Sequence, residues 1–140
     1  MKAVSRQTQG IVAAGILAIL TVSVFAGAQY SGPESAVSRF HYGVATGNAD
    51  TLRQVCLQSV QSPPAQNLIV QLDWLLKHST DFRIIQVKRR GTESAVAVLY
   101  ESPLAGTVII EYFLQKPRGR WLIDVERTWG MVARAPIGGG

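Results

Sequence analysis

The most continuous apolar pattern of the chain lies at its beginning. Residues 11–28 contain no charged side chain, and Lys2 and Arg6 precede them without an acid. About 18 apolar residues suffice to span a bilayer as a helix, and a basic N-terminal flank stays on the cytoplasmic side. The pattern predicts a single-pass segment in the cytoplasmic membrane, with the following chain outside the cytoplasm. The small residues 26–28 also fit a signal-peptidase site, so cleavage near Ala28, giving a secreted or periplasmic protein, is the alternative.

Apolar residues then recur at helical spacing in three stretches. Residues 33–47 begin with a proline in the first turn and end at a glycine, which is typical of a helix. A short helix is predicted over 51–57, capped by 48–50. A third helix follows the break at 62–64 and ends near Lys77. Its apolar stripe fits the helical template at every position and consists of Leu68, Ile69, Leu72, Leu75 and Leu76.

From Phe82 onward the period changes to two, which is typical of strands. Short connections rich in glycine and proline separate four such segments and predict antiparallel neighbours. The segments are 82–88, 94–100, 107–115 and 120–128. The predicted fold class is α+β, with three helices packed on one face of a curved four-stranded antiparallel sheet. The predicted division of the chain is a membrane anchor or signal segment over 1–30, the α+β domain over 31–130 and a flexible tail over 131–140.

Alternation along the strands predicts which side chains face the helices. The predicted inward rows are Val96, Val98 and Tyr100; Val108, Ile110, Tyr112 and Leu114; and Trp121, Ile123 and Val125. Glu111, Asp124 and Glu126 have the opposite parity, so these acids are expected on the outer face as solvated surface groups.

Charge and residue content limit the chemistry. The net charge is +5, and two of these charges are Lys2 and Arg6, so the part after residue 30 carries only +3. That surplus is too small for a nucleic-acid interface, and no nucleic-acid partner is expected. Cys56 is the only cysteine, which excludes an intrachain disulfide, and its helical position favours burial. Two histidines and one cysteine at unrelated spacings predict no metal site, and the absence of nucleophile and phosphate-loop motifs predicts no cofactor.

Three further features have both a functional and a structural interpretation. His41 lies at the edge of the stripe centred on Phe40, which favours a structural hydrogen bond over a catalytic base. The basic run 88–90 is expected at a strand end, either as a solvated turn or in contact with anionic lipid or an acidic partner. Trp74 falls off the leucine stripe of its helix and is expected to be exposed.

Some local sequences resemble those of a known superfamily. Residues 36–40 run into Gly47-Asn48-Ala49-Asp50-Thr51-Leu52, and a glycine turn precedes the strand Arg120-Trp121-Leu122-Ile123. Over residues 34–129 the chain resembles the nuclear transport factor 2-like (cystatin-like cone) superfamily, as an exported bacterial member. The resemblance implies a sheet that curls around a pocket, used by relatives for ligand binding, isomerase or dehydratase chemistry, or dimerisation. On that fold the pocket candidates are Phe40, His41, Tyr100, Tyr112 and Trp121.

These observations give one leading functional hypothesis and two alternatives. The leading hypothesis is an exported, membrane-anchored, non-enzymatic module that binds a protein partner or a small apolar ligand. The first alternative is a small cone-fold isomerase or dehydratase, which requires His41 or an acid in the cavity. The second is a scaffold subunit of an envelope secretion machine. The expected partners are the membrane, through residues 11–28, and a second copy of the chain or another envelope protein.

Overall fold

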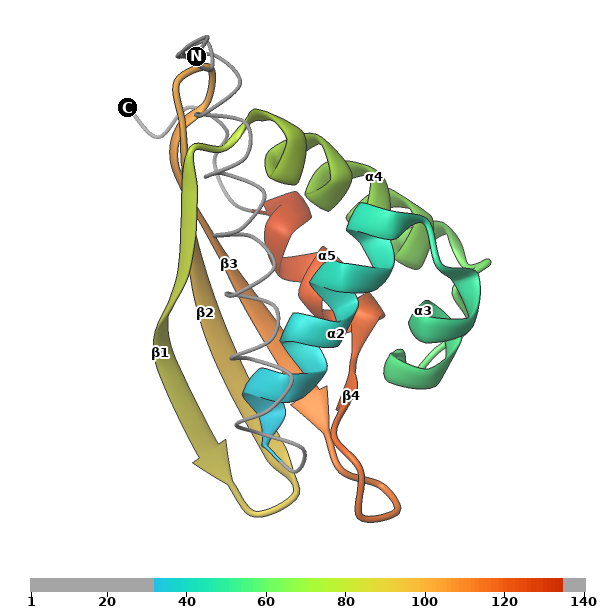
Figure 1. Cartoon of the computed structure of the whole chain (residues 1–140). Coiled ribbons are helices and arrows are strands. Elements are labelled where there is room, and N and C mark those ends of the chain that lie inside the picture. Colours follow the sequence, from blue (N-terminus) through green and yellow to red (C-terminus); the bar gives the residue numbers. More distant parts are fainter. Residues whose placement is uncertain (1–31, 135–140) are drawn as a thin grey trace, which may run out of the picture.

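A computed structural model describes residues 32–134, which form an α+β domain (Figure 1). The predicted membrane or signal segment, residues 1–30, lies outside the described residues. Among residues 32–134, no helix is both long enough and apolar enough to cross a bilayer.

All three predicted helices are confirmed. Helix α2 spans Pro33–Thr46 and ends at Gly47, whose φ of 64° is the left-handed conformation that glycine adopts most easily. Helix α3 spans Ala49–Val55, because the Asn48 side chain already accepts a hydrogen bond from the backbone N–H of Thr51 at 3.1 Å. Helix α4 spans Pro63–His78 and begins after Ser62.

The three long strands are also confirmed, and they form an antiparallel meander. Strand β1 spans Asp81–Arg90, β2 spans Glu93–Ser102 and β3 spans Gly106–Gln115, in the spatial order of the sequence. Val98 of the central strand lies opposite Ile84 on one side and Ile110 on the other. The β1–β2 register shifts between Ile84 and Gln86, a β-bulge that leaves Ile85 exposed.

The prediction of a long fourth strand was wrong. Strand β4 consists of Leu122–Ile123 only, and helix α5 follows over Val125–Arg134. Asp124 stops the strand, because its carboxylate accepts the backbone N–H of Arg127 at 3.1 Å and its carbonyl accepts the N–H of Thr128 at 3.0 Å. The described domain therefore has four helices rather than three, and α5 includes residues 131–134 of the predicted tail.

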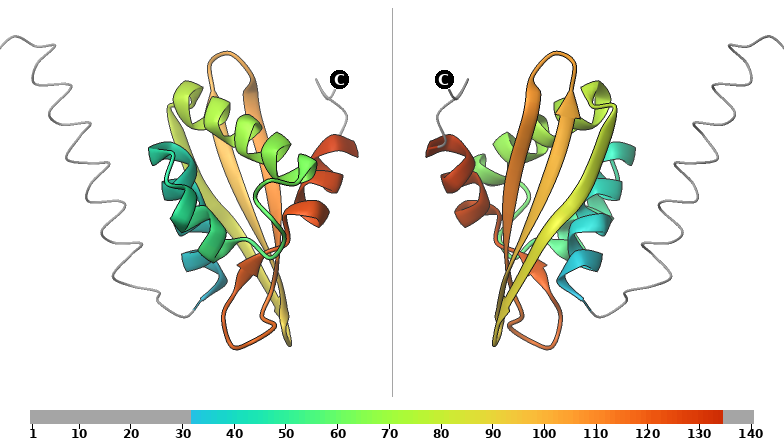
Figure 2. Two further views of the ribbon diagram at one scale, coloured as in Figure 1. Left: turned by 90° about the vertical axis from the view of Figure 1, so that its right-hand side faces the viewer. Right: turned by 90° about the vertical axis from the view of Figure 1, so that its left-hand side faces the viewer.

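The helices cover one face of the sheet and leave the other bare among the described residues. In Figure 2 they lie in front of the sheet in the left view and behind it in the right view. The core fills the space between these layers, with Leu68, Leu72 and Leu75 of α4 fully buried. Trp74 is 37% exposed, as its position off the leucine stripe predicted.

Candidate functional site

Strand parity was predicted correctly for the two central strands. Val96, Val98 and Tyr100 of β2 and Ile110, Tyr112 and Leu114 of β3 are buried, and Val108 is half-buried. Glu111 has the outward parity and is half-buried, and Glu126 is exposed on α5. The predicted inward positions at the end of the chain, Trp121, Ile123 and Val125, are buried as well.

Asp124 is the exception, and its prediction as a solvated surface acid was wrong. Only 7% of the residue is exposed. Its carboxylate accepts hydrogen bonds from the side-chain amides of Gln58 at 2.8 Å and Gln115 at 3.0 Å, besides capping α5. Parity fails here because the chain leaves the sheet at this residue. Asp124 therefore joins three segments of the fold, and its geometry is that of a structural group.

A buried chain of polar side chains crosses the interior of the domain. Nε2 of His41 lies 2.5 Å from the hydroxyl of Tyr100, and that hydroxyl lies 2.7 Å from the hydroxyl of Tyr112. The backbone of Val37 accepts a hydrogen bond from the His41 ring. With the ring proton on the side of Val37, Nε2 is the acceptor for Tyr100, and Tyr100 in turn accepts from Tyr112. Each polar atom of the cluster then has a partner.

Burial sets the protonation states of this cluster. Loss of hydration lowers the pKa of His41 to about 4, against a smaller opposing effect of the Val37 hydrogen bond. Burial also raises the pKa values of Tyr100 and Tyr112 above their ordinary range. All three side chains are therefore neutral near pH 7, whereas an efficient general base has a pKa close to the working pH.

The interior is closed by an aromatic side chain at the edge of the sheet. The ring of Phe82 stacks on His41, with centroids 5.3 Å apart, and is itself 41% exposed. Of the five predicted pocket residues, the structure brings together Phe40, His41, Tyr100 and Tyr112, with the Phe40 ring edge-on to Tyr112. These four side chains pack against one another in the interior of the domain.

Trp121, the fifth predicted pocket residue, is buried elsewhere in the core. No ring contact joins it to the other four within the described part of the chain, and the ammonium of Lys116 lies over its ring at 5.6 Å. Cys56 is buried as predicted, which raises the pKa of its thiol to about 12. Residues 32–134 contain no group of three histidine, cysteine or acidic side chains suited to a metal ion.

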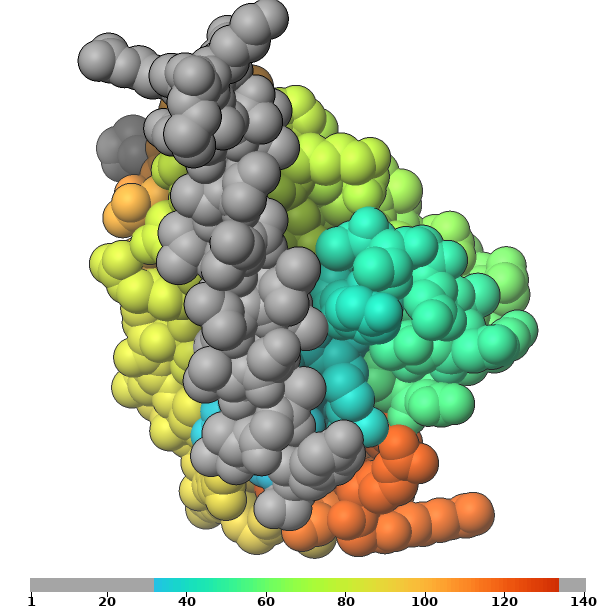
Figure 3. Space-filling model, in the orientation of Figure 1, coloured from blue at the N-terminus to red at the C-terminus, as the bar shows by residue number. Residues whose placement is uncertain are grey.

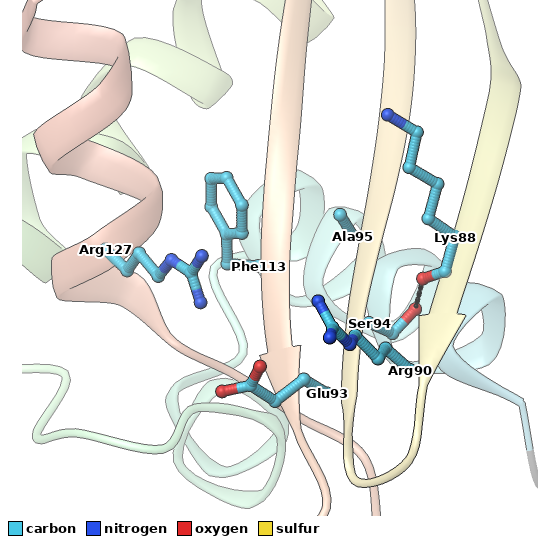
Figure 4. Close-up of a pocket in the computed structure, with 7 residues that line it drawn as sticks. All are labelled: Lys88, Arg90, Glu93, Ser94, Ala95, Phe113 and Arg127. Carbon is cyan, nitrogen blue, oxygen red and sulfur yellow. Dashed lines mark hydrogen bonds between the residues drawn. The ribbon is translucent and has the colours of Figure 1, made fainter.

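A cleft on the bare face of the sheet is the second candidate. Figure 4 shows it at the end of the sheet nearest the β1–β2 turn, and its volume is about 120 Å³. It is lined by Lys88, Arg90, Glu93, Ser94, Ala95, Phe113 and Arg127. The guanidinium of Arg127 lies 4.2 Å from the centre of the Phe113 ring. We call this feature the outer-face cleft.

The outer-face cleft is positively charged. It contains three basic side chains and one acid, and within residues 32–134 no carboxylate lies within 4.0 Å of the cationic groups of Lys88, Arg90 or Arg127. Along β3 the next outward residue is Glu111, which is half-buried, and beyond it Ile109 is 56% exposed. The cleft therefore combines an aromatic surface with uncompensated positive charge.

Part of this cleft was visible in the sequence and part was not. The basic run 88–90 was expected at a strand end, where the structure places Lys88 and Arg90. Arg127 was missed because its position depends on α5. The signal was present, since Val125, Trp129 and Val132 have helical spacing directly after an aspartate that can cap a helix.

Comparison with known proteins gives structural neighbours only. No protein-family model matches the chain, and no curated protein sequence is significantly similar to it. A crystal structure from Campylobacter jejuni, described as NTF2-like, is similar with a TM-score of 0.47 and 15% identity, covering 66% of this chain and 97% of that one. The solution structure of a SEC-C motif containing protein from Rhodopseudomonas palustris has a TM-score of 0.47 and 17% identity, covering 74% and 84%. The first carries the superfamily name that the sequence resemblance suggested.

Proposed function

We propose that this protein is an exported, membrane-tethered binding module without enzymatic activity, and that its protein partner docks on the bare face of the sheet. The partner presents an extended segment with acidic side chains and at least one apolar side chain. The acidic side chains pair with Lys88, Arg90 and Arg127, and the apolar side chain lies against Phe113. Tethering rests on the apolar segment 11–28.

The observation that carries this proposal is the composition of the outer-face cleft. Sites for small molecules usually measure about 300–1,000 Å³, whereas this cleft of about 120 Å³ has room for one side chain. Its three unpaired cations favour an acidic segment over an apolar ligand, because an apolar ligand would leave their charge uncompensated. The exposed side chain of Ile109 extends the contact area beyond the cleft.

The enzymatic alternative rests on the hydrogen-bonded cluster of His41, Tyr100 and Tyr112. A histidine with a pKa of about 4 is a weak base, and its free nitrogen already accepts the Tyr100 hydroxyl proton. All three side chains are buried and pack against neighbouring aromatic rings. The cluster therefore supports a role in holding α2 to the sheet.

Tethering is tested separately from binding. Fusion of a reporter that is active only in the cytoplasm after Gly140 should give an inactive reporter, because Lys2 and Arg6 hold the N-terminus inside. The tethered form should remain in the membrane fraction after carbonate washing. Strong reporter activity would refute export, and release of a shortened chain by washing would establish cleavage near Ala28 in place of tethering.

Binding is tested by selecting ligands from a random peptide library displayed on phage, with the full chain held in lipid nanodiscs. The peptides selected should be enriched in aspartate and glutamate beside an aromatic or aliphatic residue. Lys88→Gln with Arg127→Gln should abolish the enrichment, because both cations line the cleft. Arg53→Gln with Lys77→Gln removes the same charge from α3 and α4, on the helical side of the domain, and should leave the enrichment unchanged.

Two results would contradict the binding proposal. One is a selected set without acidic bias, and the other is equal loss of binding in both double variants. If the chain instead forms a stable dimer in the nanodiscs that Ile109→Glu dissociates, the bare face is a contact between copies and not the site of an acidic partner. Val70→Glu is the matched control for that substitution, because Val70 is 66% exposed on α4.

A further inference from the structure

Two loops and the start of α2 lie together at one end of the domain. The backbone N–H of Lys116, which opens the β3–β4 loop, donates to the carbonyl of Thr92 in the β1–β2 turn at 2.9 Å. Arg89, at the end of β1, pairs with Glu34 in the first turn of α2 at 3.4 Å. Figure 1 shows all three segments at the lower end, and in Figure 3 the β3–β4 loop projects from the body of the domain there.

This end carries the entire surplus of positive charge. Its basic side chains, which we call the basic rim, are Arg89, Arg90, Lys116, Arg118 and Arg120. Only two acids, Glu34 and Glu93, accompany the five cations, so the end has a net charge of +3. The remainder of residues 32–134 contains seven basic and seven acidic side chains and is neutral. Such a one-sided distribution gives the domain a positive pole.

The chain enters the domain at the same pole. Residues 11–28 form the predicted membrane segment, and α2 begins at Pro33. From Ala28 to Gly32 even a fully extended chain reaches only about 14 Å. The end of the domain where α2 starts must therefore lie within that distance of the bilayer surface. Arg118 and Arg120 are exposed in the β3–β4 loop at this end, and a charged surface acts through roughly 8 Å of physiological electrolyte beyond its own position.

We propose that the basic rim binds the phosphate groups of anionic lipids in the bilayer that anchors the chain. This inference rests on the proposed tethering and adds to it a defined orientation, with the strands of the sheet rising from the membrane. Arg118 and Arg120 contact headgroups directly, because neither has an ion pair within the described residues. Arginine suits this role because its planar guanidinium can donate two hydrogen bonds to one phosphate.

The experiment compares the full chain in two kinds of nanodisc, one of neutral phosphatidylcholine and one containing about one third phosphatidylglycerol. Hydrogen–deuterium exchange is followed for peptides covering 89–93 and 116–121. In the anionic discs the amide hydrogens of these peptides should exchange about fivefold more slowly, or more slowly still. Each basic residue near an anionic surface raises the binding constant by about the same factor. At high salt the difference between the discs should disappear, because the attraction is screened.

Two double variants distinguish an effect of the basic rim from an effect of the net charge of the domain. Arg118→Gln with Arg120→Gln should remove the lipid-dependent protection, and both side chains are exposed, so the fold is kept. The Lys77→Gln, Arg83→Gln variant loses the same charge far from the rim, because Lys77 lies on α4 and Arg83 lies at the opposite end of β1. This variant should retain the lipid-dependent protection. Equal exchange in both discs, or equal behaviour of the two variants, overturns the inference.

The experiments distinguish failure of the tethering proposal from failure of the lipid-binding inference. If the chain inserts into discs but shows no dependence on lipid charge, tethering stands and the rim inference is wrong. If the chain is recovered as a soluble, shortened protein, tethering is wrong and the rim is tested by co-sedimentation with phosphatidylglycerol vesicles. Sedimentation that the Arg118→Gln, Arg120→Gln variant loses supports the rim, and its absence in the natural chain overturns it.

Discussion

The pH dependence of stability tests whether His41 is a structural group. The residue is 8% exposed, and burial lowers its pKa from an ordinary 6.5 to about 4. In the unfolded chain His41 takes up a proton near pH 6.5, whereas the folded chain resists that uptake until about pH 4. Between these values the unfolded state binds more protons, so the free energy of unfolding falls as the pH falls.

The size of this effect follows from the two pKa values. One pKa unit corresponds to about 1.4 kcal/mol, so the difference between 6.5 and about 4 corresponds to a loss on the order of 3 kcal/mol at pH 4 relative to pH 7. Such a loss is a large fraction of the stability of a small domain, which is commonly about 5–15 kcal/mol. The tyrosines of the cluster stay neutral throughout and add nothing to the slope.

The assay is urea denaturation of the full chain in detergent micelles at several values between pH 4 and pH 7.5. In His41→Gln the acid-dependent part of the free energy of unfolding should shrink by about 3 kcal/mol, because glutamine cannot take up the proton. His78→Gln is the matched control, since His78 is exposed at the end of α4, and it should keep the slope of the natural chain. An unchanged slope in His41→Gln, or an NMR titration of His41 near pH 6.5, would refute the reasoning and reopen the enzymatic alternative.

Three further predictions concern packing, capping and reactivity. Leu72→Ala should lower the free energy of unfolding by about 2–5 kcal/mol in urea denaturation, whereas Val70→Ala on the exposed side of α4 should change it little. Asp124→Ala removes the cap of α5 and leaves two half-buried glutamine amides without an acceptor, at a cost on the order of 2–4 kcal/mol. Glu126→Ala should change the free energy of unfolding by no more than about 0.5 kcal/mol, and equal urea midpoints for the two variants would contradict this. Cys56 should react with iodoacetamide at pH 8 only after denaturant is added, because burial raises the pKa of its thiol to about 12; rapid labelling of the folded chain, followed by mass spectrometry, would contradict that burial.

The parts of the fold that the sequence predicted well are those where one physical requirement determines the pattern. Apart from β1, whose Ile84 and Val87 are only half-buried, each of the segments from 33 to 115 has one buried face, so the spacing of its apolar residues identifies both the element and the face. Leu68, Leu72 and Leu75 illustrate this for α4, and Val96 with Val98 for β2. Short connections with glycine, such as Gly91 at a φ of 62°, limited the strands to antiparallel neighbours.

The end of the chain was predicted poorly because two requirements produce the same local pattern. Trp121, Ile123 and Val125 alternate as in a strand, yet Val125 is also the first residue of α5 and is buried there. The choice depends on Asp124, whose carboxylate finds donors on both sides of the junction. Two of its donors, Gln58 and Gln115, are 66 and 9 residues away in the sequence, so the pattern around Asp124 could not identify them.

Several residues of the interior cluster and of the outer-face cleft were predicted from the sequence, but the contacts between them were not, for different reasons. His41 lies at the border of a helical stripe, and only the position of β2 decides whether the tyrosine hydroxyl meets it at 2.5 Å. The cleft depends on α5, which brings Arg127 over Phe113 from fourteen residues away. Tertiary packing thus determines both sites. The residues that flank these side chains in the sequence give no sign of the contacts.

The outer-face cleft and the basic rim share one residue, which decides how the two proposals can be separated. Arg90 lines the cleft and also belongs to the rim, so its substitution would weaken contacts with both an acidic partner and anionic lipid. Arg127 belongs to the cleft alone and Arg118 to the rim alone, and for that reason they appear in the two diagnostic variants. Because the cleft opens beside the rim, a partner that docks there lies close to the bilayer and meets lipid headgroups that compete for Arg90. We therefore expect partner binding to be weaker in phosphatidylglycerol discs than in phosphatidylcholine discs.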